Sequence, residues 1–378
     1  MVNDQHAIDA LHMQRAYELA RRGAGDTSPN PNVGAVFVRD GVIIGEGYHR
    51  KAGLPHAEID ALKAAGDDVR GATLYVSLEP CFHEGRTGSC ARKLVPSGLA
   101  RLVVGTLDPN PQTHGQGIRL LQDAGVEVTV LDDPEARALI EIFAAAMRHP
   151  DRPAVALKMA MSLDGYVNGT RGTRQQLTGS SWTEYVRRLR IVHDAVMVGA
   201  GTIRVDDPLL TVRPHHDRLV PFMRVVGCET DTVSETSRVF APVEGYAQTI
   251  VLAPAGVKER FENLRDVADV VFVGDETSME LDLAGAMRAL RARGVQSVFC
   301  EGGPTLGGRL IAKGLVDRLY WAIAPVLLRN ESALPVLAGA DLASLQKRID
   351  VDIVERIGDD VLISGVLRGD NDEKGKNV

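Results

Sequence analysis

The sequence has little cysteine for its length. Its 378 residues include four cysteines, Cys81, Cys90, Cys228 and Cys300, which are too few and too unevenly spaced for a disulfide framework. Cys228 and Cys300 lie in apolar stretches, where buried and unreactive thiols are expected. Metal binding, chemistry or plain burial remain open for Cys81 and Cys90.

Long apolar runs and an excess of positive charge are also absent. No run approaches the roughly 20 residues of a membrane helix, and residues 1–9 are polar and acidic, unlike a signal peptide. The 43 Lys and Arg against 50 Asp and Glu give a net charge of −7, which repels a phosphate backbone. We therefore expect a soluble, cytoplasmic protein with neither a nucleic-acid nor a membrane partner.

The length and composition indicate two domains. The 40.7 kDa chain is 44% hydrophobic and 25% charged, enough for two cores, and no repeat of fixed period occurs. A polar segment with two prolines, residues 148–153, follows a predicted helix and marks the boundary. The predicted domains are residues 1–148 and 153–368, followed by a polar tail over residues 369–378.

Helical and strand patterns alternate in both parts, which is typical of layered α/β domains. In the first part the patterns predict helices over 6–22, 55–65, 91–95, 118–124 and 134–147, and strands over 33–38, 42–45, 73–78, 102–105 and 126–131. In the second they predict strands over 155–161, 195–199, 224–227, 249–253, 269–273, 297–300 and 319–324, helices over 182–192, 281–293 and 306–313, and a strand pair within 350–367. Pro55 is placed in the first turn of its helix, which puts His56 and Glu58 near the N-terminus of that helix.

These two residues belong to a candidate metal site. One imidazole, His56, and two thiols, Cys81 and Cys90, make the ligand inventory of a catalytic zinc ion that keeps a fourth position for water. Glu58 suits proton transfer between that water and a leaving amine better than ligation. This is the pattern of zinc nucleobase deaminases, in which a Glu that is not a ligand is the general acid/base.

The spacing of the thiols departs from the usual deaminase motif, because eight residues instead of two separate Cys81 from Cys90. An alternative is that His56 only bonds to backbone at a helix N-terminus and that the thiols are merely buried. The polar, glycine-bearing segment 82–89 argues against a core position for this loop.

The loop is also where the sequence resembles a known family. Pro29–Val36, Gly47-Tyr-His49, His56-Ala-Glu58, Gly71–Val76, Leu78-Glu-Pro-Cys81, His83–Thr87, Cys90 and Asp108-Pro-Asn-Pro111 together resemble the bifunctional riboflavin-biosynthesis deaminase/reductase family, in which the long spacer is usual. The resemblance implies a cytidine-deaminase-like three-layer first domain, with His56, Cys81 and Cys90 as zinc ligands, Glu58 as the proton shuttle and Asn30 near the substrate base. Gly88-Ser89 stands where the family has two prolines, which we expect to loosen the loop.

The second part carries glycine-rich turns after predicted strands, as in Gly199-Ala-Gly-Thr202 and Glu301-Gly-Gly-Pro-Thr-Leu-Gly-Gly308. Such turns present backbone amides to phosphates. With Lys158–Gly165 and Asp206–Arg213 they resemble the reductase half of the same family, which implies a dihydrofolate-reductase-like fold and NADPH as cofactor.

The resemblance also implies binding residues in this half. Substrate contacts would be Arg174, Arg190, Leu210, Arg213 and Glu301, with Lys158 and Asp164 as candidates for orienting the sugar. Cofactor contacts would be Ala160, Gln176, Thr202, Asp206, Gly302, Gly303, Pro304, Thr305, Leu306, Gly307 and Gly308. An arginine suits a phosphate, but Arg190 beside Arg187 and Arg188 is also compatible with a solvated helix face.

Two departures from the family fall in the reductase half. Arg174 and Gln176 replace a serine and a tryptophan, which removes a flat hydrophobic surface beside the cofactor, and residues 227–230 differ from the usual Leu-Asp-Ser.

The resulting hypothesis is a bifunctional enzyme of riboflavin biosynthesis: a zinc-dependent aminohydrolase that deaminates 2,5-diamino-6-ribosylamino-4(3H)-pyrimidinone 5′-phosphate, fused to an NADPH-dependent oxidoreductase that reduces the ribosyl group to ribityl. Its homo-oligomerisation through the reductase domains is expected from the resemblance. One alternative is an active deaminase of a specialised pyrimidine-derived pathway with a degenerate reductase half. The other is a non-catalytic nucleotide sensor with structural zinc, for which His83 could be a fourth ligand, although such a site has no use for Glu58.

Overall fold

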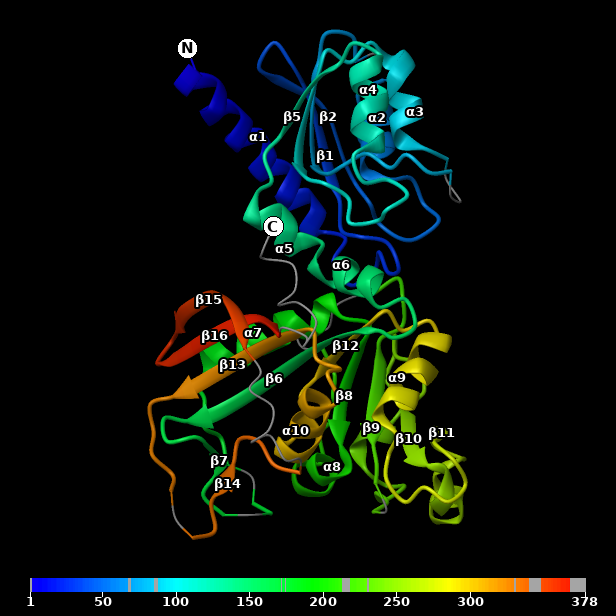
Figure 1. Cartoon of the computed structure of the whole chain (residues 1–378), viewed down its shortest axis with the longest axis vertical. Coiled ribbons are helices and arrows are strands. Elements are labelled where there is room, and N and C mark those ends of the chain that lie inside the picture. The colour runs from blue at the N-terminus through cyan, green and yellow to red at the C-terminus, as the bar shows by residue number, and fades with distance from the viewer. Residues whose placement is uncertain are drawn as a thin grey trace, which may run out of the picture. The chain divides into compact units, whose positions relative to one another are not determined.

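The computed structural model describes residues 2–66, 69–84, 88–170, 172–173, 175–212, 218–229, 231–329, 331–339 and 348–367, without the side chains of residues 2–4. The chain forms two compact units, Met1–Arg148 and His149–Val378 (Figure 1). The predicted tail over 369–378 lies outside the described residues. Within the described part of the chain, no helix combines the length and the apolarity needed to span a membrane.

The first unit contains a mixed sheet with the strand order β2-β1-β3-β4-β5. β1 is antiparallel to β2 and β3, whereas β3, β4 and β5 are parallel. Its elements are α1 (Val2–Arg21), β1 (Gly34–Arg39), β2 (Val42–Tyr48), α2 (Ala57–Ala64), β3 (Thr73–Leu78), α3 (Cys90–Leu94), the 3₁₀ helix η1 (Val95–Ser97), β4 (Arg101–Thr106), α4 (Gln116–Asp123), β5 (Glu127–Val130), α5 (Pro134–Leu139) and α6 (Glu141–Arg148).

Helices cover both faces of this sheet, which gives the expected three layers. On one face α2, α3 and α4 bury Ala61, Leu94 and Leu121 against the strands. On the other face α1 buries Tyr17 and Leu19 in a second core. The order of elements follows the sequence patterns because each strand is apolar and each helix has one apolar side.

Two glycines let α2 lie close to β2. A Cβ atom added at Gly47 would come within 2.3 Å of the Ala61 nitrogen, and one at Gly45 within 2.4 Å of the Ala61 oxygen. Any side chain at these positions would push the helix away from the sheet. The N-terminus of α2, where His56 lies, is therefore positioned by direct contact of two backbones.

Some boundaries differ from the prediction. The helix predicted from Pro55 begins at Ala57, with His56 as the N-cap, so Pro55 precedes the helix. The predicted helix over 134–147 divides into α5 and α6, because the backbone at Ile140 turns away from helical geometry (φ −110°, ψ 7°) where this side chain is buried.

The second unit is built on a nine-stranded sheet among its described residues, with the order β11-β10-β9-β8-β12-β6-β13-β16-β15. In this order, the strands from β11 to β13 are each parallel to their neighbours. β16 is antiparallel to β13, and β15 is antiparallel to β16. The elements are β6 (Ala154–Ser162), β7 (Tyr166–Asn168), α7 (Ser180–Val192), β8 (Ala195–Gly199), α8 (Ala200–Asp206), β9 (Met223–Gly227), the 3₁₀ helices η2 (Arg238–Phe240) and η3 (Ala255–Leu264), β10 (Ile250–Pro254), β11 (Asp269–Val273), α9 (Leu283–Ala292), β12 (Ser297–Cys300), α10 (Pro304–Ala312), β13 (Arg318–Ala324), β14 (Leu334–Pro335), β15 (Ile349–Ile357) and β16 (Asp360–Leu367).

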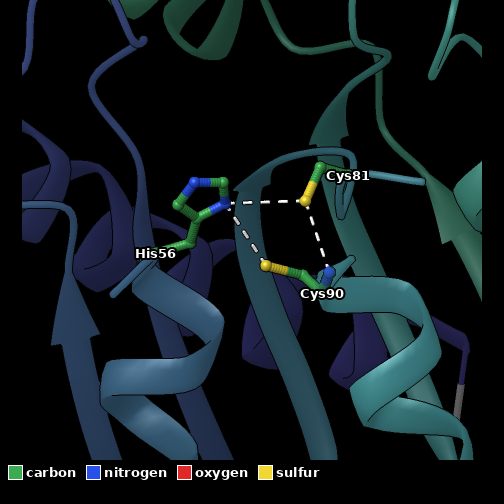
Figure 2. Close-up of side chains that lie close together, drawn as sticks. All are labelled: His56, Cys81 and Cys90. Carbon is green, nitrogen blue, oxygen red and sulfur yellow. Dashed lines mark hydrogen bonds between the residues drawn. The ribbon is translucent and has the colours of Figure 1, made fainter. Parts of the chain in front are cut away.

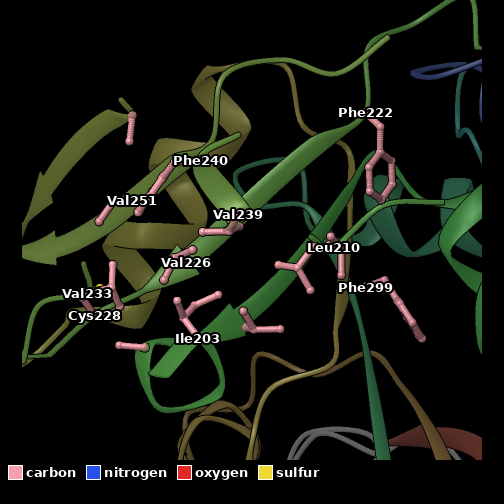
Figure 3. Close-up of a cluster of buried hydrophobic side chains, with 14 of the residues drawn as sticks. Ile203, Leu210, Phe222, Val226, Cys228, Val233, Val239, Phe240, Val251 and Phe299 are labelled. Atoms are coloured by element: carbon pink, nitrogen blue, oxygen red, sulfur yellow. The ribbon is translucent and has the colours of Figure 1, made fainter. Parts of the chain in front are cut away.

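This sheet also has a core on each face. One core joins α7 and η3 to the strands and includes Trp182 and Phe261, and Figure 3 shows part of it around Val226 and Phe299. The other packs α9 and α10 against the opposite face. Helix α8 was not predicted, because its three β-branched residues and Gly201 give little helical propensity; the buried Ile203 fixes it by tertiary packing.

A buried histidine makes the stability of the second unit dependent on pH. His193 is 2% exposed, its Nδ1–H donates to the Leu189 carbonyl at 2.7 Å, and its ring packs 5.2 Å from that of Phe299. Burial lowers the pKa of His193 from 6.5 to about 4. The folded state therefore favours the neutral ring.

We expect acid to destabilise the wild type relative to His193→Gln. Because the folded pKa is depressed, this stability is present above pH 6.5 and is lost as the pH falls toward 4, by up to about 3 kcal/mol. Urea unfolding followed by tryptophan fluorescence reports this unit, since Trp182 and Trp321 are the chain's two tryptophans. A difference between the two proteins that is the same at pH 7.5 and pH 4.5 would contradict the assignment.

Candidate active sites

Three segments that are far apart in the sequence bring together the predicted zinc ligands of the first unit. His56 is the N-cap of α2, Cys81 follows β3, and Cys90 is the first residue of α3. Figure 2 shows the three side chains directed toward one another. His56 Nδ1 lies 3.5 Å from Cys81 Sγ and 3.3 Å from Cys90 Sγ, and the Cys90 amide donates to Cys81 Sγ at 3.3 Å.

This donor set fits zinc. The ligand atoms of His56, Cys81 and Cys90 lie within 4.8 Å of one another, and among the described residues no further His, Cys, Asp or Glu joins this group. Two sulfurs and one imidazole nitrogen are ligands that zinc prefers, and three protein ligands leave a tetrahedral ion one open position. His83, the alternative fourth ligand, instead has its Nδ1 3.0 Å from Thr113 Oγ1.

The thiols are in different electrostatic settings. Hydrogen bonding from Cys90 and from the His56 ring lowers the pKa of Cys81 to about 4. The neighbouring Cys81 and burial together raise the pKa of Cys90 above its ordinary value. A divalent cation at this point would favour the thiolate form of both.

The loop between the thiols is fixed at its end. Ser89 caps α3 by accepting from the Arg92 amide at 3.3 Å, and its hydroxyl donates to the Cys81 carbonyl at 2.9 Å. The expectation that Gly88-Ser89 loosens the loop is therefore wrong at Ser89, because this side chain ties the two cysteine segments together. Residues 85–87 of the same loop lie outside the described residues.

Glu58 is buried in the first turn of α2, with 3% of its surface exposed. Burial and the nearby Cys81 raise the pKa of Glu58 to about 7. A carboxyl group with such a pKa can both accept and donate a proton near neutrality.

A cavity of about 370 Å³ opens beside these residues. Its polar lining includes side chains that the sequence argument did not assign to the site, among them His49, Asp108 and Asn110, and its apolar lining includes Phe143 and Met147. His49, Asp108 and Asn110 stood in the motifs that carried the resemblance, so the signal for them was present. Phe143 and Met147 carry no motif, and only the fold brings them to the cavity.

Asn30 and His49 form a hydrogen-bonded pair in this lining. His49 Nδ1 lies 3.0 Å from the Pro55 carbonyl, which only accepts, so this nitrogen carries the proton. Burial lowers the pKa of His49, which favours the neutral ring. Its Nε2 then accepts from Asn30 Nδ2 at 3.0 Å, which leaves the Asn30 carbonyl oxygen for a ligand.

The second unit has a cavity of about 500 Å³ at the carboxyl ends of β6, β8 and β12. This is the edge of a parallel sheet where ligands bind in open α/β folds. Of the predicted site residues, those that line it are Lys158, Ala160, Gln176, Thr202, Asp206, Glu301, Gly302, Gly303, Pro304, Thr305 and Leu306.

The glycines of this cavity fit a cofactor that approaches the backbone closely. A Cβ atom at Gly201 would meet nothing within 4 Å, and one at Gly303 only the Thr202 hydroxyl at 3.9 Å, so the absent side chains leave space open. Gly303 is also the N-cap of α10, and Pro304 takes its first turn. Gly303, Thr305 and Leu306 at this helix start line the cavity, and a helix N-terminus is suited to binding the phosphate of a cofactor.

Glu301 is the centre of a buried charge cluster. The Arg190 guanidinium binds its carboxylate through two nitrogens, one pair of atoms 3.0 Å apart, and donates from Nη1 to the Thr211 carbonyl at 2.8 Å. Burial by itself would raise the pKa of Glu301, but Arg190 and Lys158 lower it below its ordinary value. Burial also lowers the pKa of Lys158, which lines the cavity.

Several predicted contacts do not reach the cavity. Gly307 and Gly308 pack inside the fold, where a Cβ atom at Gly308 would come within 2.3 Å of the Ala338 oxygen. Asp164 instead accepts from the Ser162 hydroxyl and from the Leu328 and Arg329 amides. These bonds hold Asp164 on a turn, outside the lining of the cavity.

Leu210 and Arg190 are also outside the lining. Leu210 is 4% exposed within the core and has a φ of +53°, and Arg190 stands behind Glu301 rather than on a solvated face. Arg174 and Arg213 lie outside the described residues. The Gln176 amide, at the position of the family's tryptophan, donates to the Thr178 carbonyl at 3.0 Å.

The comparisons with known proteins agree with both sites. Residues 7–106 match the family model for the cytidine and deoxycytidylate deaminase zinc-binding region, and residues 153–363 match that for the RibD C-terminal domain. The riboflavin biosynthesis protein RibD of Escherichia coli is 36% identical over 369 residues, which cover 94% of this chain and 98% of that protein. RibD of Aquifex aeolicus is 36% identical over 359 residues, which cover 94% and 98%.

The chain belongs to the RibD family. Solved relatives match nearly the whole chain. The deaminase/reductase of Thermotoga maritima has a TM-score of 0.80 at 33% identity, covering 96% of this chain and 99% of that one, and Acinetobacter baumannii RibD has a TM-score of 0.78 at the same identity and coverage. The protein is a deaminase with a zinc-binding, cytidine-deaminase-like domain fused to an NADPH-dependent reductase domain, and it serves riboflavin biosynthesis.

We expect Cys81→Ser to lower the zinc content of the purified protein from about one ion per chain to well below that value, since it replaces a thiolate ligand with a poor one. Cys228→Ser is the matched control, because Cys228 is buried in the second unit. Metal analysis after gel filtration measures both. Equal zinc in the two variants would remove Cys81 from the ligand set.

Proposed function

We propose that His56, Cys81 and Cys90 hold the zinc ion and that Glu58 is the catalytic acid/base for hydrolytic deamination of a diaminopyrimidinone ribosyl 5′-phosphate. The substrate is inferred from the Thermotoga maritima relative, whose name describes a diaminohydroxyphosphoribosylaminopyrimidine deaminase. The observation that carries the proposal is a buried carboxyl group beside a His/Cys/Cys cluster, with Glu58, His56 and Cys81 in the lining of a cavity.

The chemistry replaces the amine of a ring carbon by the oxygen of water, with release of ammonia. Zinc held by His56, Cys81 and Cys90 would activate a water molecule for attack on that carbon by lowering its pKa toward 7. Glu58 accepts a proton from the attacking water and delivers it to the departing amine, so that ammonia rather than an amide anion leaves.

Other residues of the first unit orient the base. The carbonyl oxygen of Asn30 accepts from a ring amine or ring N–H, and His49 fixes the Asn30 amide by accepting from it. Asp108 and Asn110 also line the cavity and suit the polar groups of the sugar or the base. A pyrimidine ring is thereby held at its edge by polar groups, with Phe143 and Met147 providing apolar surface.

In the second unit we propose that the 500 Å³ cavity binds NADPH and the ribosyl group of the deaminated product. When bound there, NADPH would supply the hydride for carbon 1 of the ribosyl group, and a proton would go to the ring oxygen as its bond to that carbon breaks, which gives the open ribityl chain. Thr202, Asp206 and the amides of the Gly302-Gly303 turn hold the cofactor. Glu301, oriented by Arg190, and Lys158 bind the sugar hydroxyls, since a carboxylate accepts and an ammonium donates.

We further propose homo-oligomerisation through the reductase domain. β15 is an edge of the described sheet, and Val351 and Val354 on it are 49% and 69% exposed. Long exposed edges with apolar side chains are suited to pairing with another copy. The cytoplasmic location expected from the N-terminal residues remains a prediction.

Product analysis by mass spectrometry tests both activities. With the diaminopyrimidinone ribosyl phosphate alone we expect the deaminated product, and with NADPH added the deaminated and reduced product. Glu58→Gln should lower deamination by about 10²–10⁴-fold because the amide cannot carry the proton, while its reductase half still reduces added deaminated substrate.

Glu301→Gln should show the opposite pattern, with normal deamination and little reduction. If the wild type gives only the deaminated product both without and with NADPH, the reductase half is degenerate. The replacement of the family's tryptophan by Gln176 would be a reason for that loss. No product in either tube would favour a different substrate or a sensor.

Sedimentation equilibrium tests the assembly. We expect the wild type at twice the 40.7 kDa chain mass or more, and Val354→Glu at the chain mass, because a charge would be buried at the interface. Val130→Glu, a change of another exposed strand valine in the first unit, is the control. A monomeric wild type at micromolar concentration would contradict the proposal.

A further inference from the structure

The buried carboxylate of Glu79 is used neither for zinc nor for the chemistry. It follows β3 directly, two residues before Cys81, and is 2% exposed. Its amide donates to the Thr106 carbonyl at 3.0 Å, which continues the pairing of β3 with β4. A charge so deeply buried is costly unless hydrogen bonds compensate it.

Four backbone amides, all from residues 108–118, donate to this carboxylate. Oε2 accepts from Asp108 at 3.2 Å and Gly115 at 2.9 Å. Oε1 accepts from Gly117 at 3.1 Å and Ile118 at 3.3 Å. Two carboxylate oxygens offer about four acceptor positions, so these bonds use the whole capacity of Glu79.

Three of these amides belong to the start of α4. Its N-cap, Gly115, has no side chain to cap the helix, and no acidic residue stands in its first turn. Glu79 therefore supplies the missing cap from 36 residues earlier, with a negative charge at the positive end of the helix. Gly117 allows this approach, since a Cβ atom there would come within 2.1 Å of the Pro80 oxygen.

The fourth amide, that of Asp108, connects Glu79 to the cavity. Asp108 Oδ1 accepts from the Asn110 amide at 2.8 Å, and the Asp108 carbonyl lies 2.9 Å from His114 Nδ1. The segment 108–114 is thus a closed turn, and Glu79 binds it on both sides, at Asp108 and at Gly115. Asp108 and Asn110 from this turn line the deaminase cavity.

We propose that Glu79 is a positioning residue of the deaminase, which holds the Asp108–Asn110 turn against the substrate cavity by capping α4 and the Asp108 amide. Glu79 also borders the cavity, but its four acceptor positions are occupied, so it acts through Asp108 and Asn110. This inference rests on the proposed deaminase function.

Kinetics of Glu79→Gln, Asn110→Ala and the double variant test this role. The glutamine keeps the size but turns one oxygen into a donor facing two backbone amides. Because the turn contacts the substrate equally before and during the reaction, we expect KM for deamination to rise about tenfold or more, with kcat changed less than about threefold. Zinc content and reductase kinetics of the same protein should stay at wild-type values.

The double variant separates positioning from a general loss of structure. Because Glu79 acts through Asp108 and Asn110, the double variant should be clearly less impaired than the product of the two single effects. Glu79→Asp, which keeps the charge but has a shorter reach, should give an intermediate KM. Should Glu79→Gln not fold, hydrogen exchange of Glu79→Asp still tests the idea, with faster exchange expected in residues 107–118 and not elsewhere in the first unit.

Three results would overturn the inference. The first is an unchanged KM for deamination in Glu79→Gln. The second is a KM of the double variant equal to the product of the single effects of Glu79→Gln and Asn110→Ala. The third is faster hydrogen exchange throughout the first unit in Glu79→Asp. In each case an active wild type keeps the proposed function intact. A zinc-loaded wild type that does not deaminate the substrate would overturn the proposed function, and this inference with it.

Discussion

The deaminase site depends on the close contact between α2 and β2. Gly45 and Gly47 let the helix backbone touch the strand backbone, and this contact sets where the helix begins. His56 and Glu58 lie at that beginning, so one packing constraint positions both the proposed metal ligand and the proposed acid/base. The two cysteine segments reach the same point from different elements. Cys81 follows β3, which the sheet holds by its parallel pairing with β4, and Cys90 begins α3.

Two buried glutamates beside the cysteines show how surroundings decide the role of a carboxyl group. Glu58 is buried with little compensation, which raises its pKa to about 7 and allows proton transfer. Glu79 is buried equally but accepts from four amides, so its charge is used to hold a turn and a helix. The difference lies in the hydrogen-bond donors that the fold provides.

The reductase site follows the same principle on a larger sheet. Its cavity lies where β6, β8 and β12 end, and glycines keep the backbone open to a cofactor. Glu301 would be an unfavourable buried charge by itself, but Arg190 from α7 and Lys158 from β6 compensate it. Arg190 therefore reaches the site through Glu301. Sequence spacing could not distinguish this buried position of Arg190 from a solvated one beside Arg187 and Arg188.

The sequence alone determined the layered α/β class, nearly all strands and the three residues that the structure brings together as a candidate zinc site, because apolar periodicity and ligand chemistry are local properties. It also carried the motifs of the family. Only the tertiary structure decided that Gly307, Gly308 and Asp164 serve packing and turns instead of the cavity lining, and that Phe143 and Met147 reach the deaminase cavity. The physical reason is that lining a cavity, or capping a helix 36 residues away as Glu79 does, depends on distances between segments that a sequence does not contain.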